Sequence, residues 1–250
     1  MGDTSEKRAY LGMPGYGQLT AGAGRGFWRA SARPDRVWFQ YQQGSLLAAN
    51  FNALWCSALN LAHAGEPVAY FAMQHADIEP EEGWLDVLIA ELEARDLDVL
   101  GAAVPIKDPK GLTSLALAHP SGDPWRIARR LTMTEVFGLP ETFTSADVGA
   151  PLLLNTGLWV CRFDWRWVRK VRFTINDRIA FNTITERFEP QVEPEDWYFS
   201  RLLHELGLRI GATRKVRLTH AGETRFPNTH PWGAEEYDTA WAPGPLTPGG

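Results

Sequence analysis

The chain has 250 residues, a formal net charge of −5 and a hydrophobic content of 44%. This length suits one compact domain, so we expect a single domain over 1–250 with loosely ordered tails at about 1–7 and 241–250. The acidic balance argues against a protein held to nucleic acid by bulk charge, although a local basic groove stays open. The N-terminal segment MGDTSEKRAY has no apolar signal core, and no run of about 18 apolar residues occurs. The sequence therefore predicts a soluble, cytoplasmic protein without membrane insertion.

Apolar runs and helical periodicity alternate along the chain. Residues 17–36 are rich in Gly, Ala and Arg and give no clear pattern, whereas Ser45 can cap a helix that runs over 45–64. A second helix is predicted over 80–92, beginning at its proline, and a third opens at Pro194. The predicted strands lie at residues 8–13, 37–43, 67–74, 97–106, 151–163 and 208–218.

This alternation predicts an α/β fold with a mostly parallel central sheet flanked by helices. Ligands of such sheets bind outside the carboxyl ends of the strands. His75 and Asp77 follow the strand at 67–74, and His220 follows the strand at 208–218. The sequence therefore places these three side chains at the edge where a ligand is expected.

Asp77 and His220 are the candidate metal ligands. Read alone, Asp77 also suits a turn or a helix cap, and His220 also suits the protein surface. As a pair they offer an oxygen and a nitrogen that fit Mn²⁺ or Mg²⁺, which neutralises phosphates. His75 lies two residues before Asp77 and points the same way in an extended chain, so it is a further ligand, a substrate contact or a packed polar residue.

Two neighbouring carboxylates, Glu195 and Asp196, open the helix that follows Pro194. The helix dipole favours acidic residues in a first turn, so this placement alone needs no function. In the functional interpretation one of them takes a proton from an acceptor hydroxyl, and the helix start keeps it ionised, as a base requires. Lys107 follows the strand at 97–106, and it either stays solvated or meets phosphate oxygens.

Two further stretches carry candidate binding residues. Asn155 and Gly157 interrupt an apolar strand, where a glycine either allows a ligand to approach the backbone or marks a bulge. The basic aromatic stretch CRFDWRWVRKVRF contains Trp165, Arg166 and Arg169. It is either a solvated face with buried rings or a platform on which an anionic acceptor stacks.

Taken in chain order, these motifs resemble a nucleotide-sugar-dependent glycosyltransferase of the GT-A fold. The resemblance spans about residues 8–225 and rests on the turn LGMPGYG, the helix SLLAANFNALW, the strand end MQHADI, the Asn-Thr-Gly strand, the helix start EDW and the strand end THAGE. MQHADI stands where this family has its DxD motif, with His75 in place of the first aspartate. That departure leaves the ligand set open.

The resemblance implies a role for each candidate residue. Asp77 and His220 bind the metal that bridges the donor diphosphate, and Asp196 or Glu195 is the base if the enzyme inverts. Trp165, Arg166 and Arg169 are expected to contact the acceptor. The expected donor contacts are Asn52, Gln74, His75, Lys107, Asn155 and Gly157.

The donor expected first is a UDP-sugar, with a GDP-sugar next. The sequence leaves open the sugar, the acceptor, inverting or retaining chemistry and the oligomeric state, and a nucleic acid with hydroxymethylated bases is one acceptor that the basic stretch would suit. Two other classes of function also stay open. One is a metal-dependent hydrolase or phosphotransferase that uses Asp77 and His220, and the other is a non-catalytic module that binds a polyanion through the basic stretch.

Overall fold

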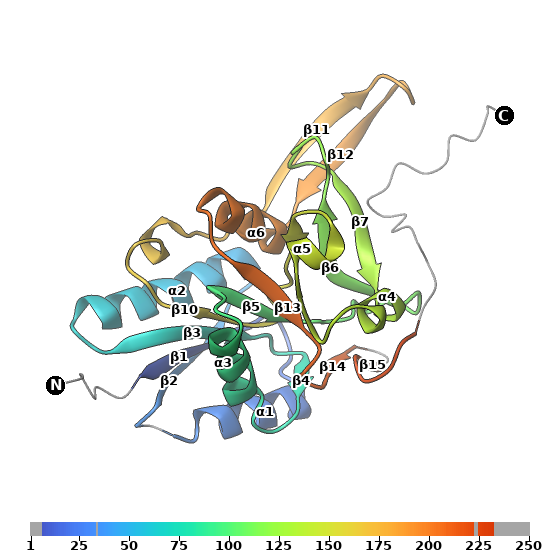
Figure 1. Ribbon diagram of the computed structural model, residues 1–250. Helices are drawn as coiled ribbons and strands as arrows, with labels where there is room; N and C mark the ends of the chain where they lie inside the picture. The colour runs from blue at the N-terminus through green and yellow to red at the C-terminus, as the bar shows by residue number, and fades with distance from the viewer. Residues whose placement is uncertain (1–6, 34, 223–224, 233–250) are drawn as a thin grey trace.

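The computed structural model describes residues 7–33, 35–222 and 225–232. Its central feature is a seven-stranded sheet in the order β2-β1-β3-β10-β5-β13-β8 (Figure 1). Strands β10 (Leu158–Arg162) and β8 (Thr142–Thr144) run against the common direction of the others. The parallel strands are β1 (Arg8–Gly15), β2 (Val37–Gln43), β3 (Val68–Gln74), β5 (Val99–Ala102) and β13 (Ile210–Thr213). This sheet confirms the predicted α/β class.

Helices cover both faces of the sheet because its strands are apolar on both sides. On β3, Phe71 and Met73 point to one face, where they pack with α2 (Leu47–His63) and α6 (Glu195–Glu205). Tyr70 and Ala72 point to the other face and pack with α1 (Ala21–Ser31) and α3 (Trp84–Ala94). This two-residue alternation gives three layers with a core on each side of the sheet. None of the helices in the described part of the chain has both the length and the apolar character needed to cross a bilayer.

Three smaller sheets lie around the central one. A hairpin of β11 (Asn176–Asn182) and β12 (Arg187–Glu193) projects from the body of the protein (Figure 1). The second sheet contains β15 (Arg225–Pro227), β14 (Leu218–Ala221) and β4 (Ile78–Pro80), and the third contains β7 (Ile127–Thr132), β6 (Leu112–Ala118) and β9 (Leu152–Leu153). The remaining short elements are α4 (Met133–Gly138), α5 (Ser145–Val148) and the 3₁₀ turn Val168–Lys170.

Two predicted helix starts are wrong. Pro80 does not begin a helix, because it pairs with Leu218 as the last residue of β4, and α3 begins only at Trp84. Ser45 does not cap α2, whose N-cap is Leu46 without a side-chain hydrogen bond. In both cases the chain ahead of the helix is held by contacts with distant segments, which override the local signal.

Three other segments also differ from the sequence prediction. The stretch at 17–36, which gave no pattern, contains α1, capped by the Thr20 hydroxyl. The predicted strand at 208–218 divides into β13 and β14, which belong to different sheets. The predicted strand at 151–163 is broken at 154–157 into β9 and β10.

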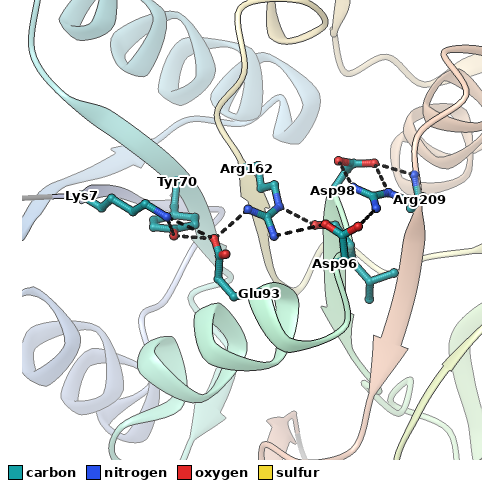
Figure 2. Close-up of polar contacts among 8 residues, drawn as sticks. Lys7, Tyr70, Glu93, Asp96, Asp98, Arg162 and Arg209 are labelled. Carbon is teal, nitrogen blue, oxygen red and sulfur yellow. Dashed lines mark hydrogen bonds and ion pairs between the residues drawn. The ribbon is translucent and has the colours of Figure 1, made fainter. Parts of the chain in front are cut away.

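An ion-pair network fastens the amino ends of the parallel strands (Figure 2). The Tyr70 hydroxyl donates to Glu93 Oε1 at 2.6 Å, and Arg162 Nη1 donates to the same oxygen at 2.8 Å. Arg209, ahead of β13, binds both Asp96 and Asp98. The network ties α3 and the turn that follows it to β3, β10 and β13 at the amino edge of the sheet.

Candidate functional site

Asp77, Lys107 and His220 meet beyond the carboxyl ends of the parallel strands. Lys107 Nζ lies 2.6 Å from Asp77 Oδ2, and His220 Nε2 lies 3.3 Å from the same oxygen. Asp77 follows β3, Lys107 follows β5, and His220 belongs to β14. The structure thus brings together three side chains that the sequence placed at separate strand ends.

Strand pairing between β4 and β14 sets this geometry. His220 is the register partner of Ile78, and Ala221 N donates to Asp77 O at 2.8 Å. Ile78 N donates to His75 O at 3.1 Å, which closes the turn between β3 and β4. The backbone on both sides of Asp77 is therefore fixed, and His220 faces its carboxylate by register.

The contact between His220 and Pro105 shows which nitrogen of the His220 ring carries a proton. Nδ1 lies 2.7 Å from Pro105 O, and because a carbonyl oxygen only accepts, Nδ1 carries a proton. Nε2 lies 3.3 Å from Asp77 Oδ2, so the imidazole and the carboxylate face one another. Such a pair can share a cation, and histidines that bind metals commonly donate their other N–H to a carbonyl in this way. The pair therefore has the donor chemistry of a divalent-cation site.

Charge compensation keeps Asp77 ionised. Burial raises the pKa of Asp77, but the His220 hydrogen bond and the Lys107 ammonium outweigh it and hold that pKa well below its usual range. Within 7–33, 35–222 and 225–232, no group of three or more His, Cys, Asp or Glu side chains is arranged to hold a metal. A metal at Asp77 and His220 would therefore take its other ligands from water or a bound substrate.

His75 is a neutral neighbour of this cluster. Its ring packs against Phe51 with centroids 5.1 Å apart, and burial lowers its pKa to about 4. Its Nε2 is buried and has no hydrogen-bond partner. Two residues before Asp77, the chain therefore presents an uncharged ring with one unsatisfied nitrogen.

The segment at 155–157 lies directly against His75. Gly157 O accepts a hydrogen bond from His75 N at 2.8 Å, and Asn155 Oδ1 accepts one from Gly157 N at 2.6 Å. A Cβ atom on Gly157 would lie 2.6 Å from that same Asn155 oxygen. The glycine is thus required by a tight turn, and the Asn155 oxygen is occupied by it.

Glu195 and Asp196 form the first turn of α6, close to this segment. The Ser200 hydroxyl donates to Asp196 O and accepts from Leu154 N. This bridge joins the start of α6 to Leu154, the residue before Asn155. Burial and the charge of Glu195 raise the pKa of Asp196 to about 8, and burial also raises the pKa of Glu195. Burial therefore opposes the ionisation that the helix start was expected to favour, and it makes this pair hold a proton more tightly than exposed carboxyls do.

Asn52 and Gln74, which were predicted to contact the sugar-nucleotide donor, use their side-chain amides in hydrogen bonds to the protein backbone. Asn52 Nδ2 donates to Phe173 O at 2.7 Å, and Asn52 Oδ1 accepts from Phe173 N at 2.9 Å. Gln74 Nε2 donates at 2.9 Å to both Ala23 O and Ile78 O. Both side chains join distant backbone segments, and Gln74 Oε1 is buried without a hydrogen-bond partner, so their contact with a donor stays a prediction.

Asn50 is a residue of this edge that the sequence did not single out. Its side chain is buried, and Nδ2 donates to Gly15 O at 3.2 Å and to Gly44 O at 3.0 Å. It therefore ties the carboxyl ends of β1 and β2 together. The sequence signal was an asparagine-bearing helix, and nothing local distinguishes Asn50 from Asn52.

The basic aromatic stretch lies at the opposite edge of the sheet. Antiparallel β10 starts with Leu158 opposite Gln74 and ends with Arg162 opposite Tyr70, about 13 Å along the sheet. Trp165, Arg166 and Arg169 come after that end, where Arg166 binds Asp164 and Arg169 lies over the Trp165 ring. The predicted acceptor platform is therefore separated from Asp77, and we do not place the acceptor there.

No protein-family model matches the chain, and no curated protein matches it in sequence. Among solved structures, A197 from STIV is similar with a TM-score of 0.53 and 13% identity, over 92% of this chain and 96% of its own. A provisionally named UDP-N-acetylglucosamine pyrophosphorylase from Entamoeba histolytica is similar with a TM-score of 0.41 and 9% identity, over 84% and 74% of the two chains. The first likeness shows a shared fold, and the second is too weak to carry an argument.

Proposed function

We propose that the chain is a metal-dependent glycosyltransferase that moves a sugar from a nucleoside-diphosphate sugar to an acceptor hydroxyl. One observation carries the proposal: Asp77 Oδ2, His220 Nε2 and Lys107 Nζ converge at the carboxyl edge of a mostly parallel sheet. A carboxylate and an imidazole suit Mn²⁺ or Mg²⁺, and an ammonium beside them suits phosphate oxygens. A UDP-sugar is the first donor to test, and a GDP-sugar is the second.

The residues would act on two groups: the departing diphosphate and the attacking hydroxyl. The metal would neutralise charge on the departing diphosphate. Lys107, which is partly exposed, would exchange its contact with Asp77 for a phosphate oxygen. As the sugar–phosphate bond breaks, its electron pair goes to the diphosphate oxygen, and Asp196 takes the proton from the attacking hydroxyl. A pKa of about 8 places that carboxyl where proton transfer at neutral pH is effective.

The experiment is a screen of the purified protein with Mn²⁺ against UDP, GDP and their sugars. Melting temperature reports binding, and mass spectrometry reports donor consumption. We expect one nucleoside diphosphate to raise the melting temperature only with metal, and the matching sugar nucleotide to be consumed. Asp77→Asn should abolish both effects, whereas Asp86→Asn, an exposed aspartate paired with Arg33, should retain them.

Other outcomes of the same screen separate the alternative functions. A response to inorganic phosphate as large as the response to any nucleotide would indicate a hydrolase or phosphotransferase. Binding of a polyanion that survives Asp77→Asn, without turnover by the wild type, would indicate a binding module. If no nucleoside diphosphate shifts the melting temperature in the presence of metal, the transferase proposal is wrong.

A further inference from the structure

The β11–β12 hairpin has two chemically different faces. Phe181 is paired with Phe188, and Ile179 is paired with Pro190. Because cross-strand partners share a face and successive residues alternate, these four side chains lie together on one side of the hairpin, with the Asp177–Val192 pair beside them toward its base. The other side carries the polar residues Arg178, Asn182, Glu189 and Gln191.

The polar face is satisfied within the protein. Arg178 Nε donates to Gln191 Oε1 at 2.8 Å, and the Arg178 guanidinium lies 4.4 Å from the centre of the Trp125 ring. Asn182 Nδ2 donates to Glu189 Oε2 at 2.9 Å. This face is therefore the one turned toward the body of the protein.

The apolar face is open to solvent. Ile179 is 78% exposed, Phe188 is 74% exposed and Phe181 is 52% exposed. In the described part of the chain, β11 and β12 pair only with each other, and a lone two-stranded hairpin is marginally stable in water. Glu193 anchors the base by accepting from Asn176 and Arg201, so the arm stays in place while its apolar side has no partner.

Charge and area indicate what covers this face. Residues 175–193 contain four carboxylates and two arginines, which disfavours an anionic membrane or a nucleic acid. The exposed Phe and Ile side chains offer roughly 500 Å² of apolar surface per copy. Two such faces would bury about 1,000 Å², the lower limit for a specific protein interface. A second copy of the chain supplies a face of the required size and chemistry.

We propose that two copies of this protein associate face to face through the apolar sides of their β11–β12 hairpins. A two-fold axis places the same residues of both copies in contact, as expected for an isologous dimer. The Phe181 and Phe188 rings, 5.2 Å apart within one copy, would continue their edge-to-face packing across the axis. The small area is that of a weak, reversible dimer.

Analytical ultracentrifugation of the whole chain from about 1 to about 200 µM tests the proposal. The wild-type mass should rise with concentration from 28.0 kDa toward twice that value. Phe188→Asp should weaken association at least about 100-fold, because it buries a charge in the apolar contact. Trp28→Asp, which changes an aromatic 59% exposed on α1, should associate as the wild type does. A wild type that stays monomeric at every concentration, for instance because another segment of the chain covers the face, overturns the proposal.

Cross-linking gives a second readout that does not depend on Phe188. In a Cys56→Ser background, Ile179→Cys should be joined between copies by a bis-maleimide that spans about 10 Å, the spacing of stacked sheets. Arg178→Cys, on the opposite face, should give at least about 10-fold less dimer under the same conditions. Equal cross-linking of the two variants, or none from Ile179→Cys, contradicts the face-to-face arrangement.

Discussion

Replacing Asp196 with asparagine should stabilise the protein in mildly alkaline solution. Burial and the charge of Glu195 raise the pKa of Asp196 from 3.8 to about 8. Between these values the folded protein holds a proton that the unfolded chain has released, so unfolding releases a proton. The free energy of unfolding of the wild type therefore falls as the pH rises from about 4 to about 8. Asparagine carries no charge at any pH and removes this loss.

The expected magnitude follows from the size of the pKa change. A rise of about four in the pKa corresponds to an upper limit of about 5 kcal/mol. The Asp196 carboxyl is only partly buried, and Arg130 offsets some of the penalty, so we expect about half of this limit. Asp196→Asn should therefore be about 2–3 kcal/mol more stable than the wild type at pH ~8.5 and nearly equal to it at pH ~4.

Urea unfolding followed by tryptophan fluorescence measures this difference across the pH range. Asp86→Asn is the control, because loss of its exposed ion pair with Arg33 should change stability by no more than about 1 kcal/mol, with no increase between neutral and alkaline pH. If Asp196 also removes the proton of the acceptor, the more stable variant should lose about 10²–10⁴-fold in transfer rate. A stability difference that does not grow with pH, or a variant less stable than the wild type at pH ~8.5, would refute the reasoning.

Two further substitutions test contacts that hold the site in place: the Arg162–Glu93 ion pair and the turn at Gly157. Arg162→Met should lower the free energy of unfolding by roughly 1–2 kcal/mol, because it leaves the Glu93 carboxylate without its arginine. Tyr70 and Arg162 hold the pKa of Glu93 below its usual range, so in urea unfolding this loss should shrink as the pH falls through that lowered pKa, and an undiminished loss in acid would argue against the ion pair. Gly157→Ala should lower stability by roughly 1–3 kcal/mol, because the added methyl meets Asn155 Oδ1. The double variant Asn155→Ala/Gly157→Ala should recover part of that loss in thermal unfolding, and no recovery would contradict the proposed clash.

Local signals were enough for the elements that form the frame. The strand at 37–43 and the helix that follows Pro194 were predicted from apolar runs and first-turn residues alone, and they agree with β2 and α6. The strand ends at Asp77 and Lys107 were also placed at the correct edge, because parallel strands direct their carboxyl ends to one side. Short-range physics determines these features, so they can be predicted from sequence.

The remaining features depend on pairing between distant segments. Nothing near Pro80 indicates that it pairs with Leu218, yet this pairing removes a predicted helix start and brings His220 to Asp77. The direction of β10 likewise decides that Trp165 lies away from the site, and no local pattern gives that direction. The pKa of Asp196 is raised by burial that only the folded chain creates, so no local pattern indicates this shift.

Calorimetric titration of UDP and GDP, each with and without Mn²⁺, tests the central claim most directly. We expect Mn²⁺ to strengthen binding of one of these nucleotides at least about 10-fold, since a metal held by Asp77 and His220 would take further ligands from the diphosphate. Asp77→Asn and His220→Gln should each remove the effect of Mn²⁺, while Asp86→Asn should keep it. Binding that is the same with and without Mn²⁺, or variants that respond to Mn²⁺ as the wild type does, would contradict the account.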